Sequence, residues 1–297
     1  MPTADRQSRA VPPVVRRIRQ YRQVTGRLPP LLRPRTFNEK LNWRICLDRR
    51  ALLAPTCDKL AMKDSARRLA PGLVRVPRTL WSGTDVRELA EVGLPRHWVL
   101  KPNHSCRRVL VGAGAADPAV LADRTAGWVG EEYWRLNEEW AYRRARPGLL
   151  VEEFVGVPGH VPVDLKVLVF AGVPRVVEVH TGRGAQHGIR FHTPDWQPLP
   201  WTAGYRPGPP APPPRRLDDL LAAAAALAVG FDMLRVDFYE HDGELWFGEL
   251  TPYPGGGWTA LEPDVDALLG SWWALPGRRA AAAGAWTPGP AVEEAAA

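Results

Sequence analysis

The sequence predicts a protein of the α+β class, in which helical segments and antiparallel hairpins occupy separate stretches of the chain. The 297 residues are 45% hydrophobic, which is enough for two or three packed subdomains with a sizeable core. Apolar residues recur with a helical period in some segments and fill short runs bounded by Gly, Pro or Asn in others. We find no internal repeat, so a mixed globular fold is expected.

The N-terminal part of the chain carries three helical patterns. A short basic helix is expected at residues 14–24, closed by TGRLPP. The segment TFNEKLNWRICLDRR predicts a second helix, because Thr36 or Asn38 can cap its first turn ahead of an apolar stripe. The segment CDKLAMKDSARRLAP predicts a third helix that stops at Pro71-Gly72.

The remaining elements are mostly strands. RVPRTLW, HWVLKPN and GLLVEEFVG are expected to be short strands, and residues 118–146 a long helix. VDLKVLVFAGVPRVVEVHT predicts a hairpin that turns at Gly172. A proline-rich surface loop, RPGPPAPPPRR, precedes a helix at residues 217–229, and the last twenty residues are expected to be a mobile tail.

Composition and charge exclude several classes of protein. No run of about 18 apolar residues and no segment of signal-peptide length is present, so we expect a cytoplasmic protein without a transmembrane segment. Three cysteines without metal-binding spacing are expected to be reduced thiols. The net charge of +7 is spread along the chain without interleaved aromatics, which favours a solvated basic surface over a nucleic-acid partner.

The segment RVDFYEHDGELWFGELTPYPGGG predicts a hairpin with carboxylates on one face. If it turns through a three-residue loop at His241-Asp242-Gly243, one face carries the polar residues Arg235, Asp237, Glu249 and Thr251. The opposite, apolar face would carry Leu234, Val236, Phe238, Trp246 and Leu250. One interpretation is an amphipathic hairpin whose polar face is simply exposed to solvent. A magnesium site is the other, because two nearby carboxylates repel unless a cation lies between them.

Lysine occurs at only five positions, Lys40, Lys59, Lys63, Lys101 and Lys166, in a chain whose other cations are arginines. Lys101 ends an apolar strand and precedes the loop NHSCRR, which contains Ser105. A surface lysine is the simpler interpretation, but such a loop can also cover phosphates. The strand that ends in Glu152-Glu153 can expose backbone N–H and C=O groups along one edge. These groups can form hydrogen bonds with a purine, with an acid near the ribose.

These motifs, taken in order, resemble the TupA-like branch of the ATP-grasp superfamily. The motifs are RTFNEKLNW, DKLAMK, VLKPNHS, EWAYR…LLVEEFVG, VDLKVLVFAG and the final hairpin, and they span roughly residues 35–276. The resemblance implies two α+β subdomains that sandwich ATP behind a smaller N-terminal domain. The expected divisions are a basic arm at 1–34, an N-terminal domain at 35–100, a lid subdomain at 101–155, a C-terminal subdomain with the metal site at 156–278, and the tail at 279–297.

The resemblance also assigns roles to individual residues. Lys59, Lys101 and Ser105 would contact ATP phosphates, Lys166 would lie near the γ-phosphate, and the backbone after Glu152, at Glu153 and Phe154, would face adenine. Asp237 and Glu249, with Thr251 beside them, would hold Mg²⁺. Arg235 and Lys166 would be catalytic, and Gly255, Gly256 and Gly257 would lie against the acceptor carboxylate. Thr251 stands where many relatives have Asn, and the loop NHSCRR lacks the usual glycines.

The function expected from this resemblance is ATP- and Mg²⁺-dependent ligation of a carboxylate to an amine through an acyl phosphate. Its substrates would be small molecules or peptides, in the biosynthesis of a peptide-like product or a surface polymer. Two alternatives stay open from the sequence. One is a kinase that phosphorylates a hydroxyl, such as that of a sugar, and the other is a nucleotide- or polyanion-binding protein without turnover.

Overall fold

Two β-sheets form the framework of the protein. A computed structural model describes residues 11–157, 159, 162–182 and 186–277. The larger sheet has the strand order β11-β10-β5-β6-β7-β8, all antiparallel, and β9 pairs in parallel with β7. Its strands are β5 (Val163–Phe170), β6 (Val173–Thr181), β7 (Gly188–His192), β8 (Pro198–Leu199), β9 (Arg206–Pro207), β10 (Met233–His241) and β11 (Glu244–Thr251).

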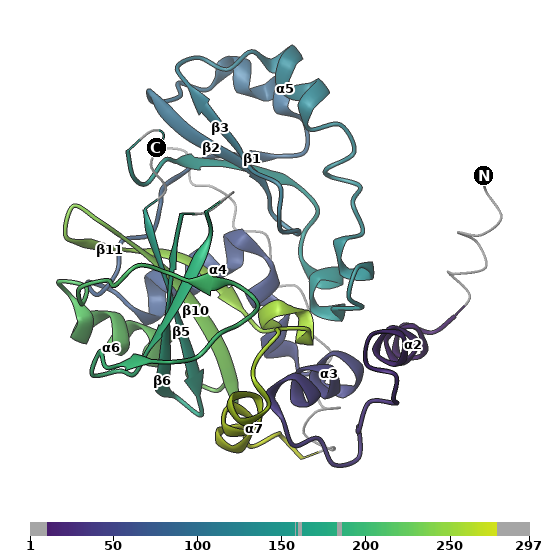
Figure 1. Ribbon diagram of the computed structural model, residues 1–297. Coiled ribbons are helices and arrows are strands. Elements are labelled where there is room, and N and C mark those ends of the chain that lie inside the picture. The colour runs from purple at the N-terminus through teal and green to yellow at the C-terminus, as the bar shows by residue number, and fades with distance from the viewer. Residues whose placement is uncertain (1–10, 158, 160–161, 183–185, 278–297) are drawn as a thin grey trace.

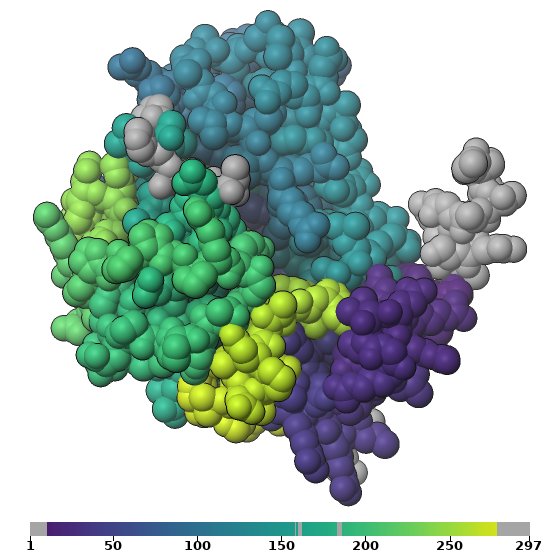
Figure 2. Space-filling view, in the orientation of Figure 1, coloured from purple at the N-terminus to yellow at the C-terminus, as the bar shows by residue number. Residues whose placement is uncertain are grey.

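The smaller sheet is antiparallel, with the order β1-β4-β2-β3, and lies above the larger one in Figure 1. Its strands are β1 (Thr79–Gly83), β2 (His97–Pro102), β3 (Leu110–Ala113) and β4 (Leu149–Glu153). Helix α5 (Pro118–Arg124) packs with the 3₁₀ segment Val86–Glu91 on one face of this sheet, where Trp98, Leu100 and Leu121 are buried. The surface of the molecule is hollowed between the two lobes (Figure 2).

Helices cover one face of the larger sheet and one end of the other face. Helix α4 (Lys59–Leu69) and helix α6 (Leu217–Leu227) pack on the face that carries Val167, Val236 and Phe238. Helices α3 (Phe37–Leu47) and α7 (Pro263–Trp272) cover one end of the sheet through a second apolar cluster. Because side chains alternate along a strand, Leu168 and Phe170 of this cluster share a face with Lys166, and that face is polar only beyond the part that α3 and α7 cover.

The predicted cap of α3 is confirmed at Thr36, and the predicted helix α4 also begins with a side-chain cap. Thr36 and Glu39 form a capping box at the start of α3, and the Asp58 side chain accepts the backbone N–H of Ala61 at the start of α4. Helix α2 (Pro13–Thr25) ends at Gly26 in the left-handed conformation, with φ 73°. Within the described residues, no helix is long and apolar enough to cross a membrane.

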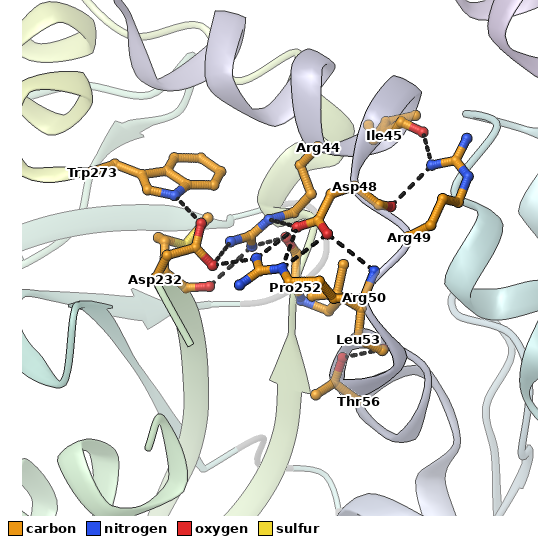
Figure 3. A network of polar contacts seen from close by, with 11 residues as sticks. Arg44, Ile45, Asp48, Arg49, Arg50, Leu53, Thr56, Asp232, Pro252 and Trp273 are labelled. Atoms are coloured by element: carbon orange, nitrogen blue, oxygen red, sulfur yellow. Dashed lines mark hydrogen bonds and ion pairs between the residues drawn. The ribbon is translucent and has the colours of Figure 1, made fainter. Parts of the chain in front are cut away.

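A buried ionic network joins α3 to the ends of the β10–β11 hairpin (Figure 3). The Arg44 guanidinium donates to the carbonyl oxygens of Met233 and Pro252, both at 2.9 Å, and to Asp232 Oδ1 at 2.8 Å. Arg50 pairs with both Asp48 and Asp232 at 2.6 Å. The network therefore fixes the N-terminal helices to the point where β10 begins and β11 ends.

The prediction of one long helix over residues 118–146 was wrong. Helix α5 ends at Arg124, and Gly127 follows with φ 78°, a conformation that ends a helix. Two short 3₁₀ segments, Tyr133–Arg135 and Trp140–Arg144, occupy the rest. Glu138 between them has a positive φ of 58° and forms two hydrogen bonds with Arg16.

The turn of the β10–β11 hairpin also differs from the prediction. It has two residues, Asp242 and Gly243, with φ of 52° and 73°, and His241 pairs with Glu244. Asp-Gly suits a type I′ turn, which matches the twist of the strands. The shorter turn places Leu245 and Phe247 in the core, so the prediction that Trp246 belongs to the apolar face was wrong; Trp246 instead lies under the Arg75 guanidinium at 5.6 Å.

The smaller sheet does not coincide with any one of the expected domains. The limit between residues 100 and 101 falls inside β2, and β1 belongs to the same sheet as β3 and β4. The small-sheet lobe therefore begins near Thr79. The expected arm at 1–34 includes α2, which packs on α3. The expected tail at 279–297 lies outside the described residues. The three cysteines are free, as expected.

Candidate active site

The four polar residues predicted to share a face of the hairpin do come together. Arg235 donates from Nε to Asp237 Oδ1 at 2.7 Å and from Nη2 to Asp237 Oδ2 at 2.8 Å. The same Nη2 lies 3.5 Å from Glu249 Oε1 and 3.3 Å from Thr251 Oγ1. In register, Asp237 faces Glu249 and Arg235 faces Thr251.

A β-bulge explains why this face is right although the predicted turn is wrong. Gly248 has no cross-strand partner, and the register shifts between Asp237 and Phe238. A Cβ on Gly248 would lie 2.9 Å from the carbonyl oxygen of Asp237, so only glycine fits this close approach. A turn shorter by one residue would shift the strand register by one and turn Glu249 to the opposite face. The extra residue in the bulge shifts the register back, so Glu249 pairs with Asp237 as predicted.

Strands β5 and β6 extend the polar row across the sheet. Asp237 pairs with Lys166, which pairs with Glu178. The Lys166 ammonium contacts Asp237 Oδ2 directly and lies 3.0 Å from Asp164 Oδ2. We call these six residues the carboxylate face: Asp164, Lys166, Glu178, Arg235, Asp237 and Glu249. It holds two more carboxylates than cations.

Asp237 is the most strongly held carboxylate on this face. It is 1% exposed, and burial alone would raise its pKa. Arg235 and Lys166 together outweigh burial and hold the pKa of Asp237 far below its ordinary range. Asp237 is therefore an anion throughout the physiological pH range, while the Glu249 side chain keeps 34% exposure beside it.

The small sheet and α4 present a second charged group, which we call the lysine cluster: Lys59, Lys63, Lys101 and Glu152. Glu152 on β4 bridges two of these lysines, since it contacts the Lys101 ammonium through Oε1 and lies 2.9 Å from Lys63 Nζ through Oε2. Burial would raise the pKa of Glu152, but Lys101 and Lys63 lower it overall. The cluster therefore has two more cations than carboxylates.

Lys59 connects the two charged groups. It begins α4, and its ammonium donates to the Ser105 carbonyl oxygen. Burial lowers the pKa of Lys59, and so does the charge of Lys101, whereas the charges of Glu249 and Glu152 raise it. The Lys59 charge therefore interacts both with Glu249 of the carboxylate face and with Glu152 of the lysine cluster.

The first half of the loop at residues 103–108 is held in place. The Asn103 carbonyl and side-chain oxygens accept the backbone N–H groups of Lys59 and Leu60. Ser105 is fully buried, and its hydroxyl has no hydrogen-bond partner among the described residues. Only the outer part, from Arg107, is exposed. Any closing movement of this glycine-poor loop is therefore expected in its outer part.

Glu153 and Phe154 do not join the lysine cluster. Glu153 accepts the Arg78 backbone N–H through Oε1 at 2.6 Å, and the Phe154 ring lies edge-on to His97 at 6.4 Å between centroids. Glu152 lies between two lysines, and its expected place near the purine or ribose stays a prediction. Strand β4 lies between β1 and β2, which pair with it at Glu152, so the prediction of an exposed strand edge at Glu152-Glu153 was wrong.

The glycine run follows the hairpin as a tight turn. Gly255, Gly256 and Gly257 have φ of 59°, 61° and 75°, which side chains rarely adopt. Arg17 of α2 donates to the Gly256 carbonyl oxygen and, through Nε, to Asn42 Oδ1 at 2.8 Å. The run is therefore clamped from the N-terminal helices.

Sequence reasoning missed several residues of this region. Lys63 had a signal, since it lies one helical turn after Lys59. Asp164 and Glu178 had a signal too, because each is a single acid in a valine-rich strand. Asp164 lies two residues before Lys166 and so shares its face, and Glu178 pairs with Lys166 across the strands. Arg17 had none: nothing in a basic N-terminal helix indicates that one arginine is fully buried against a glycine turn.

The donor set fits a hard divalent cation. Asp237, Glu249 and Thr251 offer oxygen ligands on one face, and Mg²⁺ is usually held by one or two carboxylates with phosphate oxygens and water. No group of three or more His, Cys, Asp or Glu suited to a metal occurs in the described ranges. Within those ranges the protein does not supply a complete set of metal ligands on its own. Two carboxylates are sufficient for a Mg²⁺ ion whose other ligands are phosphate oxygens and water.

The two sheets with their packed helices form an α+β protein of the ATP-grasp fold. The family model described as TupA-like ATPgrasp matches residues 39–273, and the chain belongs to this family. The resemblance inferred from the motifs is thereby confirmed. A search of curated proteins finds no match.

Solved structures of similar shape include several ligases. D-alanine--D-alanine ligase from Bacillus anthracis, complexed with ATP, is 12% identical, with 66% of this chain and 54% of that chain covered and a TM-score of 0.40. The ATP-grasp ligase PsnB, complexed with a minimal precursor, is 16% identical, with 74% and 61% covered and a TM-score of 0.40. D-cycloserine synthetase DcsG is 20% identical, with 67% and 63% covered and a TM-score of 0.39. The chain spans between about half and two thirds of the length of these proteins.

Proposed function

We propose that this protein is an ADP-forming ATP-grasp ligase that joins a carboxylate to an amine through an acyl phosphate. The observation that carries the proposal is the separation of charge between an acidic row on the larger sheet and a basic cluster where α4 meets the smaller sheet. Mg²⁺ with ATP presents a divalent cation and a polyanionic phosphate chain, and these match an acidic surface on one side and a basic surface on the other.

Each side has a separate task in this reaction. Lys59 and Lys101 bind the phosphate chain, and Asp237, Glu249 and Thr251 hold Mg²⁺, which neutralises the charge on the phosphoryl oxygens when bound. Lys166 and Arg235 already lie beside Asp237, so small side-chain movements bring them to the γ-phosphate. The adenine lies at the end of β4, against the backbone near Glu153 and Phe154.

The chemistry needs charge stabilisation more than covalent help. A carboxylate is a poor acyl donor, and transfer of the γ-phosphoryl group converts it to an acyl phosphate with release of ADP. The amine then attacks the acyl carbon, and phosphate and one proton leave. Arg235 stabilises the charge on the transferred group, while the glycine run at 255–257 receives the acceptor. Water is excluded by the loop at 103–108.

The substrates are small-molecule or peptide carboxylates and amines, in a biosynthetic reaction that yields a peptide-like product or a surface polymer. We place this activity in the cytoplasm, where ATP is available. Transfer to a sugar hydroxyl would use the same ATP site, so the two reactions differ only in the acceptor. The experiment must therefore vary the acceptor.

Thermal melting with ATP and Mg²⁺ provides the first test. A ligand at 100 times its dissociation constant stabilises the folded state by about 2.7 kcal/mol, so we expect a rise of about 5–10 °C that EDTA largely removes. ADP release is then measured with pairs of amino acids and with sugars. Amine-dependent release supports the ligase, and sugar-dependent release would favour a kinase. An unchanged melting curve at millimolar ATP would contradict both and favour a polyanion-binding protein.

A further inference from the structure

The N-terminal lobe, residues 13–36, differs in charge from the rest of the protein. It comprises α2 and the connector to α3, and it lies at the edge of the molecule away from the sheets (Figure 1). Residues 11–38 contain seven arginines and no lysine, aspartate or glutamate. The lobe is therefore an uninterrupted basic segment attached to the outside of the fold.

Three of these arginines are used within the protein. Arg16 pairs with Glu138 at 2.5 Å, Arg27 pairs with Glu39 at 2.9 Å, and Arg17 is fully buried beside the glycine run. These contacts give the lobe a fixed place on the fold. The internal packing of α2 accounts for them, so they need no external partner.

The other four arginines have no such role. Arg19, Arg22, Arg33 and Arg35 are exposed, and no ion pair joins them to a carboxylate within the ranges that the structure describes. Arg19 and Arg22 lie one turn apart on α2, which places them on adjacent positions of its outer surface. Four guanidinium groups are thus directed to solvent in a lobe that lacks compensating acids.

Two leucines are exposed in the same lobe. Leu28 is 64% exposed and Leu32 is 81% exposed, and the backbone between them turns through hydrogen bonds at Pro29 and Pro30. Such side chains cost solubility and contribute nothing to the core. Exposed leucines next to arginines are typical of surfaces that bind membranes, where the leucines insert at the boundary between lipid headgroups and acyl chains.

We propose that the N-terminal lobe docks the protein on an anionic lipid surface, with the four arginines on headgroup phosphates and the two leucines inserted beneath them. Arginine suits this contact because its planar fork donates two hydrogen bonds to one phosphate. A nucleic acid or another soluble polyanion would use the arginines but gain little from the leucines. The combination therefore favours a membrane surface over these partners.

Vesicle sedimentation tests the proposal directly and needs no substrate. The full chain is expected to bind vesicles rich in phosphatidylglycerol and not vesicles of phosphatidylcholine, with binding that weakens as salt is raised. Each Arg→Ser change at 19, 22, 33 or 35 should weaken the partition coefficient about fivefold. Leu28→Ser with Leu32→Ser should weaken it about tenfold or more at constant charge.

A matched variant separates local docking from net charge. Arg68, Arg96, Arg124 and Arg215 are exposed, form no ion pair among the described residues and lie outside the lobe. Serine at these four positions removes the same charge and should leave vesicle binding within about twofold of wild type. All of the altered side chains are exposed, so unchanged melting curves will show that folding is intact.

Three results would overturn the proposal. The first is equal binding to neutral and anionic vesicles. The second is an equal loss of binding in the matched variant and in the variant with all four lobe arginines replaced. The third is a leucine variant that binds anionic vesicles as well as wild type, which would leave a general polyanion site, to be identified with heparin and single-stranded DNA as competitors.

Discussion

The carboxylate face and the lysine cluster are built from the same kinds of contact but have opposite net charge. On the face, Asp237 is the shared centre and its partners are the cations Lys166 and Arg235. In the cluster, Glu152 is the shared centre and its partners are Lys63 and Lys101. Each side places one buried carboxylate between two cations. The excess charge comes from the residues around that centre, which are acids on the face and Lys59 in the cluster.

The proposed function uses this difference, because an acidic side suits Mg²⁺ and a basic side suits the phosphates of ATP. Each buried triad keeps its side charged and ordered without leaving an unpaired ion in the interior. The residues around each triad, Glu249 on one side and Lys59 on the other, are then available to the ligand. Variants of the buried triads and of the residues around them will show which of the two binds the ligand on each side.

The largest effect is expected at the centre of the carboxylate face. Asp237→Asn removes the anion between Lys166 and Arg235, so the free energy of unfolding should fall by about 3 kcal/mol and ADP formation should be lost. Glu249→Gln should keep the fold, because this side chain is partly exposed, but lower ADP formation about 10²–10³-fold. Denaturant unfolding and ADP release measure the two effects. A Glu249→Gln enzyme of wild-type activity would remove Glu249 from the metal site.

The next effect concerns Lys101 in the lysine cluster. Lys101→Ala removes a charge-assisted contact to phosphate and should weaken ATP binding about 10–100-fold, measured by calorimetry. Lys101→Arg should restore it poorly, because a planar fork replaces a compact ammonium. Lys40→Ala is the matched control, since Lys40 donates to the carbonyl oxygens of Gly270 and Trp273 away from the cluster. Equal ATP affinity in the two alanine variants would return Lys101 to a structural role.

A smaller effect links the two sides of the cleft. Both oxygens of Asp237 are held by cations, so Mg²⁺ alone must compete with them, whereas ATP phosphates attract the same cations away. A non-hydrolysable ATP analogue should therefore tighten Mg²⁺ binding about tenfold, and Mg²⁺ should tighten analogue binding by the same factor. Titration calorimetry of each ligand with and without the other measures this factor. Independent binding would show that the ion pairs around Asp237 do not oppose the metal.

The last effect concerns pH and tests a buried carboxylate, Glu139, that forms no ion pair with any residue the structure describes. Glu139 is 4% exposed, accepts a hydrogen bond from Asn137 at 3.2 Å, and burial raises its pKa to about 7. An unfolded glutamate titrates near pH 4.3, so between there and about pH 7 the folded state binds more protons and stability falls as pH rises. Glu139→Gln should thus gain stability relative to wild type as the pH rises from 5 to 8, by roughly 2–3 kcal/mol.

Its neighbour is the control for this prediction. Glu138 is paired with Arg16, and Glu138→Gln should lower the melting temperature at both pH values, because it breaks a buried ion pair. Melting curves at the two pH values distinguish the variants. If Glu139→Gln changed stability equally at pH 5 and pH 8, ionisation of Glu139 would not be the cause.

The sequence by itself determined the local elements and the identity of the metal-site candidates. Caps, periodicity and alternation predicted α3, α4, the β5–β6 hairpin and the shared face of Arg235, Asp237, Glu249 and Thr251. They did so because a cap or an alternating strand depends on residues close together in the chain. The same local signals failed at residues 125–146, where helical composition continues after Gly127 has ended the helix.

Only the tertiary structure decided which charges neutralise one another. Glu152 is 89 residues from Lys63 along the chain, and Arg17 is 239 residues from Gly256, so no spacing rule connects them. The bulge at Gly248 likewise depends on the backbone of the partner strand. Net charge on each side of the cleft is set by how two sheets and α4 pack, because packing determines which side chains are buried together and must therefore be paired.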